Sequence, residues 1–115
     1  MSDQTTTMSV LRDEVRRFVD EREWNAFHDP KNLSMAIATE AAELMEHFRW
    51  LTNDQAREIR GSASDMQMIR EELADIMCFA LSFANALEID VTTALREKMV
   101  KNAQKYPVEK FRGRF

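Results

Sequence analysis

Glycine and proline are nearly missing from this chain, which has two of each among 115 residues. Tight turns between strands depend on these residue types, so their scarcity argues against a β-rich protein. A content of 44% hydrophobic and 31% charged residues is instead typical of amphipathic helices. The sequence therefore predicts an all-α protein with one domain over residues 1–115, in which 1–7 are disordered and 108–115 form a tail.

Cysteine and long apolar runs are scarce as well. The single Cys78 rules out an internal disulfide and fits a reducing compartment. Residues 1–10 are polar and acidic, whereas a secretory signal needs an apolar core. The longest apolar run is interrupted by Asp75, Ser82 and Asn85 and is shorter than the roughly 20 residues that a membrane span requires. We therefore expect a cytoplasmic protein with no membrane partner.

Basic residues are not concentrated anywhere, and the net charge is -4. A nucleic-acid partner is not expected, because such partners require a basic patch. Histidine is limited to His28 and His47. Di-iron carboxylate bundles need a Glu-x-x-His motif on each of two helices, and the residue three before His47 is Leu44. The sequence therefore argues against a di-iron centre.

What the chain does contain is two pairs of carboxylates in apolar helical surroundings. Glu40 and Glu43 are three residues apart, and so are Glu72 and Asp75, so each pair shares one face of a helix. A carboxylate on an apolar face is costly unless something pairs with it. Neither Glu72 nor Asp75 has a basic residue three or four positions away. The pattern favours a bound cation, although carboxylates that are merely solvated on helix surfaces remain an alternative.

Periodicity and capping residues place these pairs on separate helices. Pro30 is expected to end any regular helix at or before Asp29, which leaves a loop after the first helix. Short connections between the helices indicate an antiparallel four-helix bundle, with the two acidic pairs facing each other across it. At this chain length a partner subunit is expected to complete the bundle. The four main helices are expected at residues 8–23, 32–51, 65–88 and 91–105, and a short helical piece is expected at 54–60.

Four carboxylates without a thiolate or paired histidines are ligands for a hard cation, so Mg²⁺, or Mn²⁺ in its place, is expected instead of Zn²⁺. Mg²⁺ in proteins is commonly shared with the phosphates of a substrate. Lys98, Asn102 and Lys105 share a face of the last helix, where they form either a clamp for anionic oxygens or an ordinary solvated stripe. Trp24 and His28 in the loop either plug one end of the bundle or form a wall on which a base stacks.

Four segments in this order carry a resemblance to a known family: EREWNAFHDPKNL, EAAELMEHFRW, EELADI and KMVKNAQKYP. Together they resemble the MazG-like nucleoside triphosphate pyrophosphohydrolases, in particular the small single-domain branch that includes the dCTP pyrophosphatases. The resemblance implies an all-α fold, assembly as a homodimer or homotetramer with active sites between subunits, and hydrolysis of a (d)NTP to the monophosphate and pyrophosphate.

The resemblance also assigns roles to single positions. Glu40 and Glu43 match the family's ExxE metal ligands, and Glu72 and Asp75 match its ExxD ligands, which implies Mg²⁺ at these four residues. Positions that match the family's contacts to the phosphates and sugar are Lys98, Asn102, Lys105 and Tyr106. Positions that match those near the base are Trp24, His28 and Trp50.

The expected reaction is an in-line attack of water at the α-phosphorus, with the carboxylates holding Mg²⁺ against the triphosphate. Glu46, one turn beyond Glu43, is a candidate general base or ligand that acts from outside the four metal ligands. The resemblance favours dCTP or a related deoxynucleotide, but stacking on tryptophan does not discriminate between bases. A phosphohydrolase that releases orthophosphate and a non-catalytic helical interaction module with a structural cation site are the alternatives.

Overall fold

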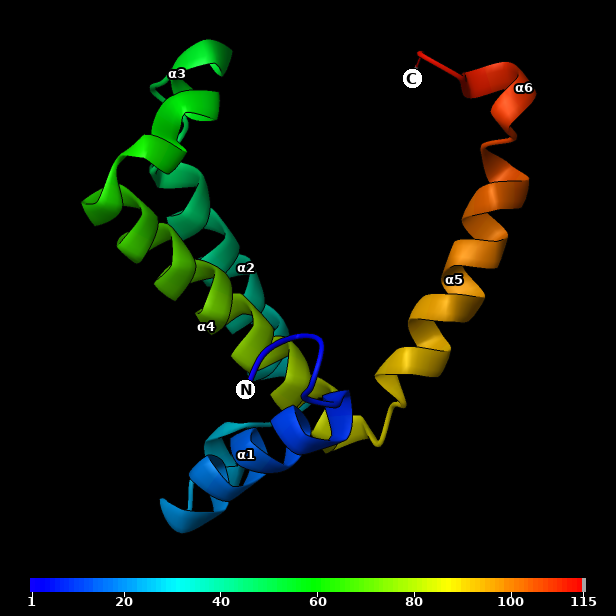
Figure 1. Ribbon diagram of the computed structural model, residues 1–115. Helices are drawn as coiled ribbons and strands as arrows, with labels where there is room; N and C mark the ends of the chain where they lie inside the picture. Colours follow the sequence, from blue (N-terminus) through cyan, green and yellow to red (C-terminus); the bar gives the residue numbers. More distant parts are fainter. Residues whose placement is uncertain (115) are drawn as a thin grey trace.

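The computed structural model describes residues 1–114, and all regular structure in this range is helical, which confirms the all-α prediction. Figure 1 shows a hairpin of long helices, a helix that crosses its lower end, and a separate arm. The elements in chain order are α1 (Met8–Glu21), η1 (Asn25–Phe27), α2 (Pro30–Glu46), α3 (Asn53–Glu58), η2 (Ile59–Gly61), α4 (Ala63–Leu87), α5 (Val91–Lys105) and α6 (Val108–Phe111).

The hairpin is formed by α2 and α4, which run antiparallel and pack along their length, with α3 and η2 joining their far ends (Figure 1). Leu33 of α2 is 2% exposed, and Leu81 and Ala84 of α4 are also buried. Burying a leucine side chain stabilises a fold by about 1.5–3 kcal/mol, so these contacts hold the two helices in register. The prediction that the two helices with the acidic pairs lie side by side is therefore confirmed.

α2 begins two residues earlier than the expected start at Asn32. No regular helix runs through Pro30, as expected, but Pro30 is itself the first residue of α2, and the Asp29 side chain caps this helix by accepting from the backbone N–H of Asn32 at 2.9 Å. Proline fits the first helical position because its missing N–H would have no intrahelical partner there. At the other end α2 stops at Glu46 instead of Leu51, because the chain tightens into a turn in which the N–H of His47 donates to the Leu44 carbonyl.

α1 is tied to the C-terminal end of α4 by a small polar network. Arg12 donates to the Asn85 Oδ1 atom at 3.0 Å and to the Ile89 carbonyl at 2.6 Å. Arg16 donates to the same Asn85 oxygen at 3.1 Å, and the Asn85 amide nitrogen donates back to the Arg12 carbonyl. Val19 of α1 is buried beside this network. These contacts set α1 across the lower end of the hairpin, where it covers the last turns of α4.

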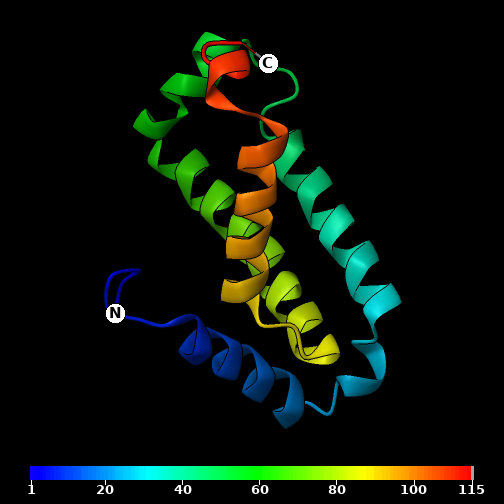
Figure 2. The ribbon, with the colours of Figure 1, turned by 90° about the vertical axis from the view of Figure 1, so that its right-hand side faces the viewer.

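The arm begins where α4 ends. Glu88 adopts the left-handed conformation, with φ 55°, and the axes of α4 and α5 differ by 102°. No residue of α5 is buried, and α5 lies away from the hairpin in Figure 1, although the two overlap in the rotated view of Figure 2. The radius of gyration is 17.1 Å, whereas a compact chain of this length has about 13 Å. The chain by itself therefore does not close the expected four-helix bundle.

The two chain ends also take defined local structure. In the segment 1–7 the N–H groups of Thr5 and Thr6 donate to the Ser2 carbonyl. In the tail, α6 folds back so that Phe111 contacts Tyr106 edge to face, with ring centroids 5.3 Å apart. Within residues 1–114 no single helix meets the length and hydropathy of a membrane span; α4 and α5 meet them only as a bent pair.

Candidate active site

Three of the four predicted ligands meet in the middle of the hairpin. Glu40 and Glu43 project from α2 and Glu72 from α4, and one carboxylate oxygen of each lies within 4.8 Å of the others. Glu40 and Glu72 are half-buried, and each has an Oε2 atom that is shielded from solvent and has no hydrogen-bond partner in the described chain. Unpartnered carboxylate oxygens that converge in this way can hold a metal ion.

Asp75 completes the acidic surface without belonging to the tight cluster. It follows Glu72 by one turn of α4, is exposed, and lies close enough to act electrostatically on Glu40. Within residues 1–114, the ion pairs involve none of these four carboxylates. In the described part of the chain no basic side chain therefore neutralises these carboxylates.

The crowding of negative charge changes the titration of Glu40. A shared hydrogen bond with Glu43, burial, and the nearby Glu72 and Asp75 raise the pKa of Glu40 from 4.5 to about 7. Near neutral pH the cluster therefore holds either a proton or a cation. A divalent cation fits this donor set, because it would replace the proton and satisfy the buried oxygens together.

This pKa predicts how stability depends on pH. Because the Glu40 carboxyl binds its proton more tightly in the folded chain, the stability of the cation-free protein should fall as pH rises from 4.5 to about 7. We expect a lower melting temperature in EDTA at about pH 8 than at about pH 5, and a stabilisation by Mg²⁺ that grows with pH. Differential scanning fluorimetry of the wild type and Glu40→Gln measures both. The variant should lose most of this pH dependence; an unaltered profile would contradict the assignment.

An aromatic wall continues from the carboxylates along α4. Trp24 stacks on His28 with ring centroids 6.4 Å apart, and His28 lies 6.3 Å from Phe79. Phe79 follows Asp75 by one turn, so it places this wall directly beyond the acidic cluster. Trp24 and His28 are thus brought together, as expected for a base-binding wall or a plug. Phe79 was not assigned to the site from sequence, although its spacing from Glu72 and Asp75 was a usable signal.

Other predicted residues lie elsewhere in the single chain. Trp50 comes after the C-terminal end of α2, is 79% exposed and lies under the Arg49 guanidinium, so it is at the opposite end of α2 from Trp24. Glu46 is exposed and forms an ion pair with Arg49 at 2.7 Å. Neither side chain joins the carboxylate cluster.

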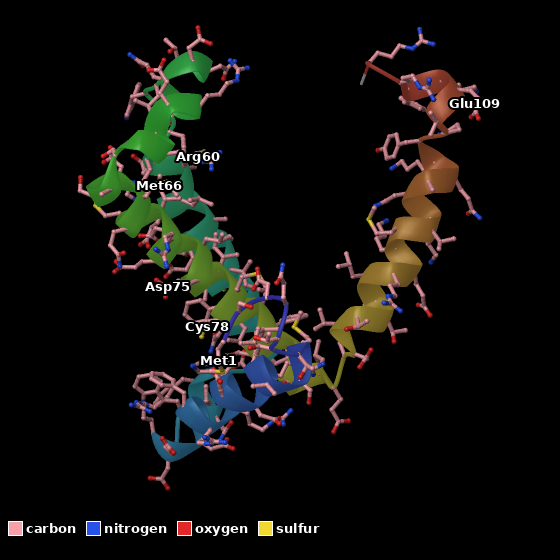
Figure 3. The ribbon with its side chains drawn as sticks, viewed as in Figure 1. Met1, Arg60, Met66, Asp75, Cys78 and Glu109 are labelled. Carbon is pink, nitrogen blue, oxygen red and sulfur yellow. The ribbon has the colours of Figure 1, made fainter. Side chains whose placement is uncertain are left out.

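The predicted phosphate-binding residues are also separated from the carboxylates. They lie on α5 or at its end, and Figure 3 shows this arm, with Glu109 on α6, far from Asp75 on α4. All are on the surface of the chain, and Asn102 is the least exposed. The expected clamp facing the acids is therefore not formed within one chain. The residues concerned are Lys98, Asn102, Lys105 and Tyr106.

Comparisons with known proteins agree with this architecture. The chain is 32% identical over 107 residues to dCTP pyrophosphatase 1 of Rattus norvegicus and 32% identical over 101 residues to that of Homo sapiens. These alignments cover 93% and 88% of this chain but only 63% and 59% of those proteins. The crystal structure of a pyrophosphatase from Archaeoglobus fulgidus superposes with a TM-score of 0.81 at 35% identity, covering 93% of this chain and 98% of the other. Residues 35–114 match the MazG-like family, to which this chain belongs.

Proposed function

We propose that this chain is a Mg²⁺-dependent nucleoside triphosphate pyrophosphohydrolase that converts dCTP or a related deoxynucleotide to the monophosphate and pyrophosphate. The observation that carries the proposal is the cluster of Glu40, Glu43 and Glu72, whose oxygens converge without a basic partner. The names of the relatives, dCTP pyrophosphatase 1 and a pyrophosphatase, support the same reaction class.

Each carboxylate has a definite task in this proposal. Glu40, Glu43, Glu72 and Asp75 would hold the cation, with Mn²⁺ as a possible substitute for Mg²⁺. When bound, the cation supplies positive charge that neutralises the triphosphate oxygens as negative charge shifts toward the leaving group. The carboxylates also orient water toward the α-phosphorus.

The base would bind along the wall formed by Trp24, His28 and Phe79, which begins one turn beyond Asp75. Stacking on such a wall contributes about 1–3 kcal/mol per base without selecting among bases. The preference for dCTP therefore rests on the relatives, and a role in cleaning the nucleotide pool follows from it.

We also propose that the active site is completed in a homodimer or homotetramer. The phosphate-binding residues of α5 cannot reach the carboxylates of their own chain, because the arm leaves the hairpin at an angle of 102°. The arm exposes large apolar side chains, and unpartnered faces of this kind mark protein interfaces. A second copy would cover this face and bring Lys98 and Asn102 toward its carboxylates.

A chromatographic product analysis tests the reaction. The protein with Mg²⁺ and each of the four dNTPs or CTP should release monophosphate and pyrophosphate, most rapidly from dCTP, and EDTA should abolish the reaction. Orthophosphate as the first product would instead indicate a phosphohydrolase. If no nucleotide is hydrolysed and none raises the melting temperature, the non-catalytic interaction module becomes the better interpretation.

A further inference from the structure

A cavity of about 140 Å³ lies between α1, η1 and the C-terminal end of α4. None of the four predicted metal ligands lines it. Apolar atoms form more of its surface than polar atoms do, but six of the residues that line it carry polar side chains. They are Arg16, Asp20, Asn25, His28, Ser82 and Asn85.

Two polar atoms of these lining residues lack a hydrogen-bond partner within the described chain. Ser82 is 6% exposed, and its Oγ atom is buried without a partner, as is the Nδ1 atom of His28. Ser82 also stands between the buried apolar residues Leu81 and Ala84, where a hydroxyl contributes nothing to packing. Buried polar atoms in native proteins almost always have partners, so these two point to a polar occupant of the cavity.

Other polar groups around the cavity are already held in place. The Asn25 amide donates to Asp20 Oδ1 at 3.0 Å, and Arg16 donates to Asn85 Oδ1. The second carboxylate oxygen of Asp20, Oδ2, accepts no hydrogen bond within residues 1–114. Asp20 is also the one acidic residue among those that line the cavity. The cavity is thus a preformed site that offers a fixed acceptor beside the hydroxyl and the imidazole.

The cavity lies at a defined distance from the carboxylates. Glu72, Asp75, Phe79 and Ser82 follow one another at spacings of three, four and three residues, so they share one face of α4. Ser82 is seven residues beyond Asp75, which corresponds to about 10 Å along the helix axis. This is comparable to the distance between the base and the phosphates of a nucleoside triphosphate. His28 borders both the aromatic wall and the cavity, and it connects the two regions.

We propose that the pyrimidine ring of the nucleotide lies where the aromatic wall meets this cavity, against His28, with its polar edge inside the cavity and with Ser82 and Asp20 as specificity-determining residues. The assignment rests on the proposed function, because it takes the carboxylates as the phosphate end. An enclosed cavity of about 150 Å³ holds one benzene ring, so this half-open cavity of about 140 Å³ has room for a single six-membered ring, whereas a fused purine would extend out of it. Ser82 Oγ and His28 Nδ1 bind the polar edge of the ring. The free Asp20 oxygen accepts from an exocyclic amino group, which cytosine has and uracil lacks.

Ser82→Ala tests the assignment with little risk to the fold, because the hydroxyl that it removes has no partner in the described chain. The preference for dCTP over dATP, measured as a ratio of kcat/KM values, should fall about tenfold, as expected for one lost hydrogen bond. Asp20→Asn should lower the preference for dCTP over dUTP. Ser64→Ala, a serine exposed on the first turn of α4, is the matched control and should leave both ratios unchanged. Unchanged ratios in Ser82→Ala would overturn the proposal and show that the cavity holds only water.

A binding measurement separates this proposal from the proposed reaction. Isothermal titration calorimetry with dCMP and dAMP requires no turnover. Tighter binding of dCMP by the wild type, weakened about tenfold in Ser82→Ala, supports the cavity even if no triphosphate is hydrolysed. Equal binding of the two nucleotides, or equal affinities in wild type and variant, overturns it even if pyrophosphate is released.

Discussion

Replacing Glu72 by glutamine should abolish turnover while leaving the helical fold intact. The Glu72 carboxylate converges with those of Glu40 and Glu43, and one of its oxygens is buried without a partner in the described chain. Glutamine keeps the shape but removes a negative ligand. Mutating a residue that only orients a metal ligand typically lowers metal affinity or activity by about 10–100-fold. Removing a metal ligand itself should therefore lower kcat/KM by more than about a hundredfold. Steady-state kinetics with dCTP and Mg²⁺ measures this.

The same substitution should also raise the melting temperature of the cation-free protein, because it relieves repulsion among the carboxylates. Glu71→Gln is a suitable control, since Glu71 is the preceding residue, is exposed and accepts from Gln67 at 2.8 Å on another face of α4. The control should retain activity and Mg²⁺ stabilisation. A Glu72→Gln variant as active as this control would contradict the assignment of the carboxylate cluster as the catalytic cation site.

The double substitution Leu95→Glu with Met99→Glu should convert the assembled protein to monomers and remove most of its activity. These residues are 60% and 56% exposed and lie one turn apart on α5, the helix that buries none of its own residues in the chain. Placing two charges on this face would oppose its burial against a second copy. Sedimentation equilibrium should show a monomer, and kcat/KM for dCTP should fall more than about tenfold, because Lys98 and Asn102 would no longer meet a partner's carboxylates.

A matched control places the same two side chains on the opposite face of α5. Lys101→Glu with Gln104→Glu should retain the assembly and most of the activity, since these residues point away from Leu95. A wild-type protein that sediments as a monomer with full activity would refute the proposed completion of the site by a second copy. If the Leu95→Glu, Met99→Glu variant still assembles, the interface lies on another face of the chain.

The local features of this protein were readable from its sequence because they depend on residues only a few positions apart. The spacing of Glu40 and Glu43, and of Glu72 and Asp75, placed each pair on one helix face, and the structure brings three of these carboxylates together. The last long helix was predicted at residues 91–105, and its observed boundaries agree, with Asp90 as its cap. In these cases the local pattern and the packing favour the same structure.

The start of α2 shows how closely local reasoning places a helix end. No regular helix was expected to run through Pro30, and the next helix was expected from residue 32; α2 begins two residues earlier, at Pro30, with Asp29 as its cap. Proline is unfavourable inside a helix but fits its first position, where its missing N–H would have no partner. The exact first residue therefore depends on the Asp29 cap, which the spacing of apolar residues does not reveal.

Tertiary structure alone decided where the helices lie relative to one another. The sequence determined the helical class, the two acidic pairs and the positively charged face of α5, because each follows from spacing within one helix. The direction of α5 depends on the left-handed residue Glu88, and the cavity beside Ser82 depends on three separate elements that meet. Backbone turns and contacts between distant residues carry no periodic signal, so the separation of α5 from the carboxylates and the preformed cavity became visible only in the folded chain.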